Sequence, residues 1–395
     1  KIWCQSPIHS CLAEGFVQNI RMSLRCVFFL ICLFIPYLLQ AAVEAFEIGP
    51  SNTDQLPKGK EADGIIGDFV MRNGHVTAVI SGNQPLRRAN MSTFYGDGVT
   101  TPGCLYDLTL NERQNDQLTV FAPSNQRGDV SHVRIVHSDG ETAEIEVVVD
   151  ASRNNGLYKR HTYRIDTNSK GILVTTTYKN LSEATKSGSV DDYWKPSGKR
   201  GTFNGIRWID AVDPSDKGAY AIGWLPESGE RHKGLVSHPG SLSLKPGEHK
   251  TFTRYITVGN SPAEALGEVF KYTNKSSSEV SIEIKNSTTA LINLTSKGSS
   301  WPAYPSEKGK TTFSLPEGDY HIEIIDRGRK SVKQKITVNQ KETFKLQFEL
   351  SALAGVAFDV RNEFGAPALG AQVEIVLEDG SMLTEYVRTH QGYAS

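Results

Sequence analysis

The densest group of side chains that could bind a ligand lies between residues 87 and 107. It contains two arginines, an asparagine, a tyrosine and an aspartate: Arg87, Arg88, Asn90, Tyr95 and Asp107. Guanidinium groups pair with carboxylates through two parallel hydrogen bonds, and tyrosine rings pack against sugars. These residues are therefore predicted to line a ligand-binding groove. The simpler alternative, which the small number of ligand sites per protein favours, is an ordered loop whose arginines bond carbonyl oxygens and nearby acids.

A second group of polar and aromatic residues spans 191–195, with the sequence Asp-Asp-Tyr-Trp-Lys. The flanking residues, 185–201, are rich in Ser, Gly and Lys, so we expect an exposed, mobile loop here. Asp191 and Asp192 are adjacent in sequence, which does not suit the facing carboxylates of a glycosidase. This segment is therefore not predicted to be a catalytic site.

The ten histidines are scattered along the chain and show no metal-binding pattern. His232 and His238 are six residues apart in a loop that contains Gly and Pro, which is not the spacing of ligands on a helix. His132 and His137 are five apart on an expected strand, where they point to opposite faces. The chain also lacks a nucleophile elbow and a phosphate-binding glycine loop. No catalytic residue, metal site or cofactor is predicted.

The N-terminal segment has the pattern of a secretory signal peptide. Met22 and a basic residue precede the uncharged apolar run 26–39, which is too short for a bilayer of about 30 Å. The small residues Val43 and Ala45 fit signal peptidase, so we expect cleavage near Phe46, a secreted or periplasmic protein and no membrane span afterwards. An uncleaved anchor helix is the alternative. Residues 1–21 are interpreted as upstream sequence.

Charge and cysteine content narrow the function further. The chain of 395 residues has 43 Lys and Arg against 44 Asp and Glu, which gives no basic field for nucleic acid. Four of the five cysteines lie within residues 1–45, so only Cys104 remains beyond the leader. No intramolecular disulfide is then available, and Cys104 is predicted to be a buried small apolar residue.

The rest of the chain predicts an all-β protein made mainly of antiparallel sandwiches. Turn residues separate short strands in three hairpins, at 69–80, 133–149 and 158–178, and later strands are expected at 219–224 and 251–258. A capping box and a proline at the first helical position predict one helix at 261–272. The predicted domains are a leader (1–45), a large β-sandwich (46–273), a small sandwich (279–350) and the start of a second, truncated one (351–395). The polar linker 274–278 marks the main boundary.

Two resemblances add to this interpretation. Residues 311–320 (TTFSLPEGDY) are similar to the G-x-F-x-L-x-x-G-x-Y strand pair of carboxypeptidase-regulatory-like domains, and 359–373 with 388–392 resemble the opening of another. The resemblance implies seven-stranded, transthyretin-like modules that serve as spacers or as carbohydrate-binding-like domains.

The second resemblance covers residues 56–69, 85–95 and 102–108. They are similar to the N-terminal region of large secreted bacterial proteins that end in a PHP-type (CehA/McbA-like) metallohydrolase domain. Such hydrolases bind metal through a His-x-His motif, and this chain has none. The resemblance therefore implies a non-catalytic front portion, whose partner would be a C-terminal metallohydrolase domain.

Three functions remain in competition. The first is an extracytoplasmic, non-catalytic accessory, binding or spacer protein, with carbohydrate or a cell-envelope polymer as the expected partner. The second is a carbohydrate-active enzyme built on a mutarotase-like super-sandwich, which requires a His and a carboxylate close together, such as His161 or His75 with Asp107. The third is a structural cell-surface protein.

Overall fold

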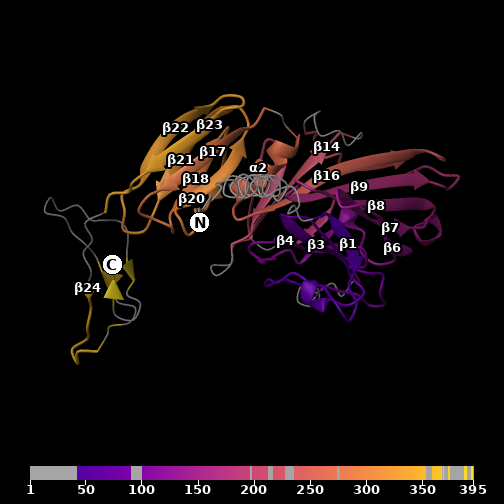
Figure 1. Cartoon of the computed structure of the whole chain (residues 1–395), viewed down its shortest axis with the longest axis horizontal. Helices are drawn as coiled ribbons and strands as arrows, with labels where there is room; N and C mark the ends of the chain where they lie inside the picture. The colour runs from indigo at the N-terminus through magenta and orange to yellow at the C-terminus, as the bar shows by residue number, and fades with distance from the viewer. Residues whose placement is uncertain are drawn as a thin grey trace, which may run out of the picture. The chain divides into compact units, whose positions relative to one another are not determined.

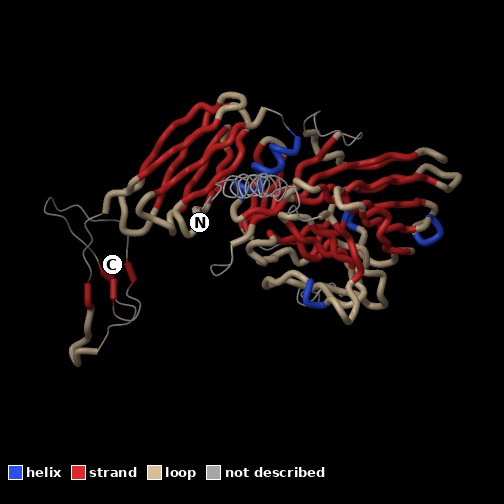
Figure 2. Tube along the Cα trace, in the orientation of Figure 1, coloured by secondary structure: helices blue, strands red, loops and turns tan. Residues whose placement is uncertain are grey.

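The computed structural model describes residues 42–89, 100–195, 198–211, 217–226, 235–273 and 276–352, together with short parts of 358–394. Almost every regular element in these residues is a β-strand, and most pairs are antiparallel, as the sequence predicts (Figures 1 and 2). The chain divides between Gly259 and Asn260 into two compact units. No described helix is long and apolar enough to cross a membrane.

The first unit contains two large sheets. The smaller has six strands, in the order β1 (Glu44–Glu47), β2 (Phe69–Arg72), β3 (Val76–Ile80), β4 (Leu105–Leu110), β5 (Val120–Ala122) and β11 (Tyr193–Lys195). The larger has eight, in the order β12 (Lys199–Phe203), β13 (Ile206–Asp210), β14 (Ala219–Leu225), β16 (His249–Gly259), β9 (Gly171–Asn180), β8 (Leu157–Asp166), β7 (Thr142–Val149) and β6 (His132–Ser138). A separate pair joins β10 (Lys186–Ser189) to β15 (Ser241–Leu244).

The three predicted hairpins are confirmed as β2–β3, β6–β7 and β8–β9. The turn of the first is held by Asn73, whose Oδ1 accepts hydrogen bonds from the backbone N–H groups of His75 (2.8 Å) and Val76 (2.9 Å). An asparagine side chain that bonds the following backbone stabilises such a turn locally. Local patterns of this kind explain why the hairpins are readable from sequence.

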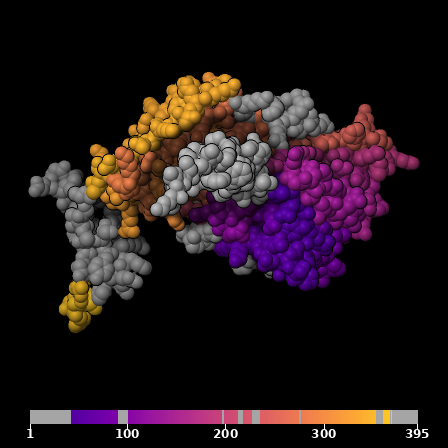
Figure 3. All heavy atoms as spheres, in the orientation of Figure 1, coloured from indigo at the N-terminus to yellow at the C-terminus, as the bar shows by residue number. Residues whose placement is uncertain are grey.

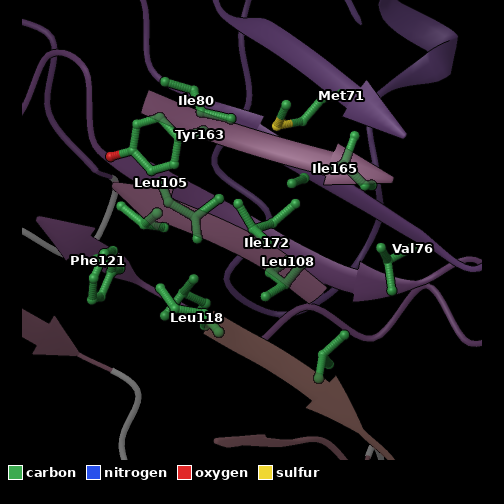
Figure 4. Packing of buried hydrophobic residues seen from close by; sticks show 14 of the residues in the cluster. Met71, Val76, Ile80, Leu105, Leu108, Leu118, Phe121, Tyr163, Ile165 and Ile172 are labelled. Atoms are coloured by element: carbon green, nitrogen blue, oxygen red, sulfur yellow. The ribbon is translucent and has the colours of Figure 1, made fainter. Parts of the chain in front are cut away.

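The hydrophobic core of the first unit lies between the two sheets. Met71, Val76 and Ile80 of the six-stranded sheet meet Tyr163 and other apolar side chains of the eight-stranded sheet (Figure 4). Each of these residues is almost completely buried. Alternating side chains on each strand supply this layer, as sandwich packing requires. The space-filling view shows the indigo and magenta atoms of the unit as one continuous surface (Figure 3).

The first strand begins before the predicted cleavage position. Val43 is 1% exposed and belongs to the core, and β1 pairs with β2 from Glu44 to Glu47. A chain that started at Phe46 would keep only half of β1. The structure therefore places the start of the folded unit at or before Val43, ahead of the domain boundary expected at residue 46. The signal-peptide run itself, 22–39, lies outside the described residues.

The second unit is a smaller sandwich with one α-helix. Its three-stranded sheet has the order β20 (Lys310–Leu315), β17 (Ser278–Ile284), β23 (Thr343–Phe348), with β17 and β23 parallel. Its four-stranded sheet has the order β19 (Ser299–Ala303), β18 (Leu291–Ser296), β21 (Gly318–Ile325), β22 (Val332–Val338). Beyond residue 352, β24 (Phe358–Asp359) pairs with β27 (Tyr393–Ala394), and β25 (Gln372–Val373) pairs with β26 (Val387–Arg388).

Helix α2 (Pro262–Thr273) confirms the predicted helix, but it packs on a different unit from the one expected. The Ser261 hydroxyl accepts the N–H of Glu264 (3.3 Å), and the Glu264 carboxylate accepts the N–H of Asn260 (3.0 Å), which closes the cap. The helix contacts β19 and β20 of the second unit. The sequence had grouped it with the first, because the polar linker that follows it suggested a boundary there.

Candidate functional site

The best candidate site is a pocket of about 380 Å³ in the first unit. It is lined by two tryptophans, two arginines, an aspartate and small or apolar residues: Asp192, Trp194, Arg200, Gly201, Thr202, Arg207, Trp208 and Ile209. These residues come from residues 191–195, which include β11 and are called the β11 segment below, and from β12 and β13. The sequence analysis did not select this pocket, although it singled out the segment 191–195.

The two sheets of the sandwich supply opposite walls of the pocket. On one side, β11 pairs with β5 of the six-stranded sheet, with Trp194 opposite Phe121. On the other side, β12 and β13 form the end of the eight-stranded sheet, with Arg200 opposite Ile209 and Thr202 opposite Arg207. Because side chains alternate along a strand, these four residues share one face of the β12–β13 pair.

A buried ion pair anchors the pocket. The Asp192 carboxylate accepts hydrogen bonds from Nε (3.0 Å) and Nη2 (2.7 Å) of Arg254, and both side chains are 0% exposed. Asp192 also accepts the backbone N–H of Ser124 at 2.7 Å. Burial raises the pKa of Asp192, while Arg254 and the Ser124 N–H oppose that shift. The two-pronged contact with Arg254 favours the ionised carboxylate, and it ties the β11 segment to β16.

The guanidinium of Arg254 is held on its other sides too. Its Nη1 donates to the Thr176 hydroxyl at 2.7 Å, and its charge lies 5.2 Å from the Trp224 ring centroid and 5.7 Å from that of Phe121. Cation–π contacts of this kind stabilise a cation that is removed from water. Arg254 is therefore a structural centre, with contacts to the β11 segment, β9, β14 and β5.

The loop that contacts Asp192 has an uncommon backbone. Ser124 has φ 52° and ψ 34°, and Asn125 has φ 51°, so two successive residues without the freedom of glycine are left-handed. Such conformations cost free energy and persist where the surroundings impose them. The hydrogen bond from the Ser124 N–H to Asp192 is one such constraint.

His161 belongs to the same buried network. Its Nδ1 lies 2.9 Å from the Thr176 hydroxyl, and its Nε2 has no partner in the part of the chain that the structure describes. Burial, with Arg254 and Lys159 nearby, holds the pKa of His161 well below its ordinary value. The imidazole is therefore neutral, and its 1% exposure keeps it from a ligand in solvent.

The residues between 87 and 107 that were predicted to line a ligand-binding groove make contacts within the protein instead. Arg87 is buried, donates to both oxygens of Asp68 (2.6 and 3.1 Å), and also donates to the carbonyl oxygens of Asp63 (2.6 Å) and Arg88 (2.5 Å). Its guanidinium also stacks 4.3 Å from the Tyr106 ring centroid. These are the contacts of the ordered-loop alternative. Asn90 and Tyr95 lie outside the described residues.

Asp107 also bonds the backbone around Asp63, whose carbonyl oxygen accepts the hydrogen bond from Arg87. Its two oxygens accept the backbone N–H groups of Asp63 (2.9 Å) and Gly64 (3.2 Å). Burial, with Asp63 and Asp68 close by, raises the pKa of Asp107 to about 8. Asp63 therefore donates its N–H to Asp107 and offers its carbonyl to Arg87. Arg88 is half-buried, and its Nε finds no partner among the described atoms.

The pairing of a histidine with Asp107, which the enzyme hypothesis requires, has no direct contact to support it. His75 is exposed whereas Asp107 is fully buried, and His161 bonds Thr176. Within the described residues, no group of three or more His, Cys, Asp or Glu side chains is placed to hold a metal ion. Cys104 is fully buried, as predicted, and burial raises its pKa to about 12.

The prediction of an exposed, mobile loop at 191–195 was wrong. Tyr193–Lys195 is strand β11, and Asp192 is fully buried against Arg254. The signal that could have revealed this is Arg254 itself. It stands between Phe252 and Ile256 at an inward position of an apolar strand, where a charge requires a buried partner.

No family model and no curated protein matches the chain. Among solved structures it is similar to the Bacillus anthracis TIE protein (14% identity, TM-score 0.17), covering 67% of this chain and 49% of that one. It is also similar to a galactose mutarotase-like protein from Lactobacillus casei (9% identity, TM-score 0.30), covering 49% of this chain and 100% of that one. A third similar structure is the heparan sulfate lyase HepC from Pedobacter heparinus (11% identity, TM-score 0.31), covering 72% of this chain and 43% of that one. The chain thus spans less than half of the first and third proteins, and similarity this weak gives no information on activity.

Proposed function

We propose that this chain is an extracytoplasmic, non-catalytic β-sandwich protein whose first unit binds a carbohydrate in the pocket between β11, β12 and β13. The observation that carries the proposal is the pocket itself, in which Trp194 of β11 and the hydrogen-bonding side chains of Arg200, Thr202 and Arg207 line one cavity. The resemblance of residues 56–69, 85–95 and 102–108 supports a role as the front portion of a metallohydrolase-type protein.

The size and lining of the pocket suit a sugar. Its volume of about 380 Å³ lies within the range of small-ligand sites, roughly 300–1,000 Å³. An indole ring offers an apolar face for the C–H side of a sugar ring, and arginine and threonine offer donors for its hydroxyl groups. This pairing of an aromatic face with a few directed polar groups fixes both orientation and specificity.

The same lining argues against hydrolysis of a glycosidic bond. That reaction generally requires two carboxyl groups on either side of the bond. Among the described residues that line the pocket, Asp192 is the one carboxylate, and its oxygens are occupied by Arg254 and the Ser124 N–H. We therefore propose that this site binds its ligand without transforming it.

The test measures binding of a panel of oligosaccharides to the full chain, with calorimetry and tryptophan fluorescence as the two readouts. Trp194→Ala is expected to weaken binding at least tenfold, about 1.4 kcal/mol, because the stacking face is lost. Phe364→Ala serves as the control, since that ring is 85% exposed and is not among the pocket residues. Thermal melting checks that both variants fold. Absence of binding to every saccharide, or equal binding by Trp194→Ala, would contradict the proposal.

A further inference from the structure

The walls of the pocket come from a segment with an unusual charge distribution. From Tyr193 to Trp208 the sequence contains four cations, Lys195, Lys199, Arg200 and Arg207, and no acidic residue. The whole chain, in contrast, is nearly neutral, with 43 basic and 44 acidic residues. Asp210 ends β13 and lies opposite Lys199, so the cations on the face of β12 and β13 that lines the pocket are Arg200 and Arg207.

The carboxylate at the pocket does not cancel this charge. Asp192 is paired with Arg254 through two hydrogen bonds, and Arg207 also acts on Asp192 electrostatically. Two guanidinium groups, those of Arg254 and Arg207, thus act on a single carboxylate. Because Arg254 already neutralises Asp192, the charge of Arg207 is not cancelled by that carboxylate.

Arg207 also has an unused donor. Its Nη2 is buried from solvent, yet it makes no hydrogen bond within the described part of the chain. A buried donor without a partner costs about 1–3 kcal/mol, so such groups are ordinarily satisfied by protein, water or ligand. Arg207 lines the pocket, opposite Thr202 on β12. An oxygen atom of a ligand in the pocket would satisfy this donor.

We propose that the pocket selects an acidic saccharide, one that carries a carboxylate or a sulfate, and that Arg207 is the residue that determines this selection. This inference rests on the proposed carbohydrate-binding function and refines it. Arg207 would donate to the oxyanion of the sugar, and Trp194 would stack on the ring. Guanidinium is suited to this role because its planar donors match the two oxygens of a carboxylate or sulfate.

The experiment compares dissociation constants of the full chain for three oligosaccharides of equal length: a neutral one, a uronate-containing one and a sulfated one. The acidic saccharides are expected to bind at least tenfold more tightly than the neutral one at low salt. Arg207→Gln should remove most of this preference, because the acidic saccharides lose more affinity than the neutral one. Arg207→Lys, which keeps the charge but not the planar donors, should restore part of it. Arg153→Gln, an exposed single-charge change, is the matched control.

The outcomes separate this inference from the function on which it rests. Equal binding of neutral and acidic saccharides would leave the carbohydrate-binding function standing and overturn the selection. Binding of no saccharide would overturn both. Competition by acetate or inorganic sulfate as effective as that of the saccharides would show that the site binds only the anion, and would overturn the proposal of an acidic sugar. A stronger preference for the uronate or for the sulfated chain would support the proposal and identify the oxyanion.

Discussion

Asp107 is a buried carboxylate for which the described part of the chain provides backbone N–H donors and no cationic hydrogen-bond donor. It accepts hydrogen bonds from the backbone N–H groups of Asp63 and Gly64, while Asp63, Asp68 and Asp116 contribute further negative charge nearby. Removal from water is the largest cause of its raised pKa, about 8 against an ordinary 3.8. The residue therefore favours the neutral form over much of the range in which an exposed aspartate is ionised.

This shift predicts how stability depends on pH. Between about pH 4 and pH 8, Asp107 holds a proton in the folded chain but not in the unfolded chain, so its contribution to stability is full at low pH and is lost as pH rises. Asp107→Asn should reduce the fall in unfolding free energy by up to about 1.4 kcal/mol per pH unit in this window. Urea denaturation of both proteins from pH 4.5 to 8.5 measures the two slopes.

Exposed Asp129→Asn provides the control for this measurement. The pKa of Asp116 is also raised, by burial and by Asp107, so a smaller slope is expected to remain in Asp107→Asn. If the profiles of the original chain and of Asp107→Asn run parallel, Asp107 is ionised in the folded protein and the assignment fails.

At the scale of elements, sequence patterns identified what is local and missed what is distant. The hairpins and helix α2 follow from turn residues and a capping box a few positions apart. Strand β11 was missed because its pairing partner β5 lies some 70 residues earlier in the chain, as Trp194 opposite Phe121 shows. Strand β19 contains Pro302, a residue that argues against a strand. It is tolerated there because β19 lies at the edge of its sheet.

The placement of β11 depends on the Asp192–Arg254 pair, which gives a second prediction. Asp192→Asn leaves Arg254 buried and unpaired, and Arg254→Met leaves Asp192 likewise, so each should cost about 3–5 kcal/mol of unfolding free energy. The double variant should lose clearly less than the sum, because neither charge is then left alone. Urea denaturation of the four proteins completes the cycle.

The surface pair Arg72–Glu44 offers a matched comparison for that cycle. Its side chains are 34% and 45% exposed, so Glu44→Gln should cost no more than about 1 kcal/mol. Losses at Asp192 and Arg254 that are small and additive would show that β11 is held by its backbone pairing to β5 alone.

At the scale of the whole molecule, the division into two units decides where each property resides. All residues that line the pocket lie between 192 and 209, within the first unit. The fold class was predictable from alternation and turns throughout the chain. The assignment of α2 was not, because an amphipathic helix shows that one face is buried but not which sheet buries it.

The last prediction tests that assignment. Leu266, Val269 and Phe270 are buried on α2, and each contributes roughly 1.5–3 kcal/mol if its burial is lost. Since domains are stable by only about 5–15 kcal/mol, residues 276–352 without the helix should be largely unfolded. Residues 260–352 should instead unfold cooperatively, as followed by circular dichroism in urea. Residues 42–259 should in turn retain saccharide affinity within twofold of the full chain. If 42–273 proves more stable than 42–259 while 276–352 folds as well as 260–352, the helix belongs to the first unit, as its sequence context suggested.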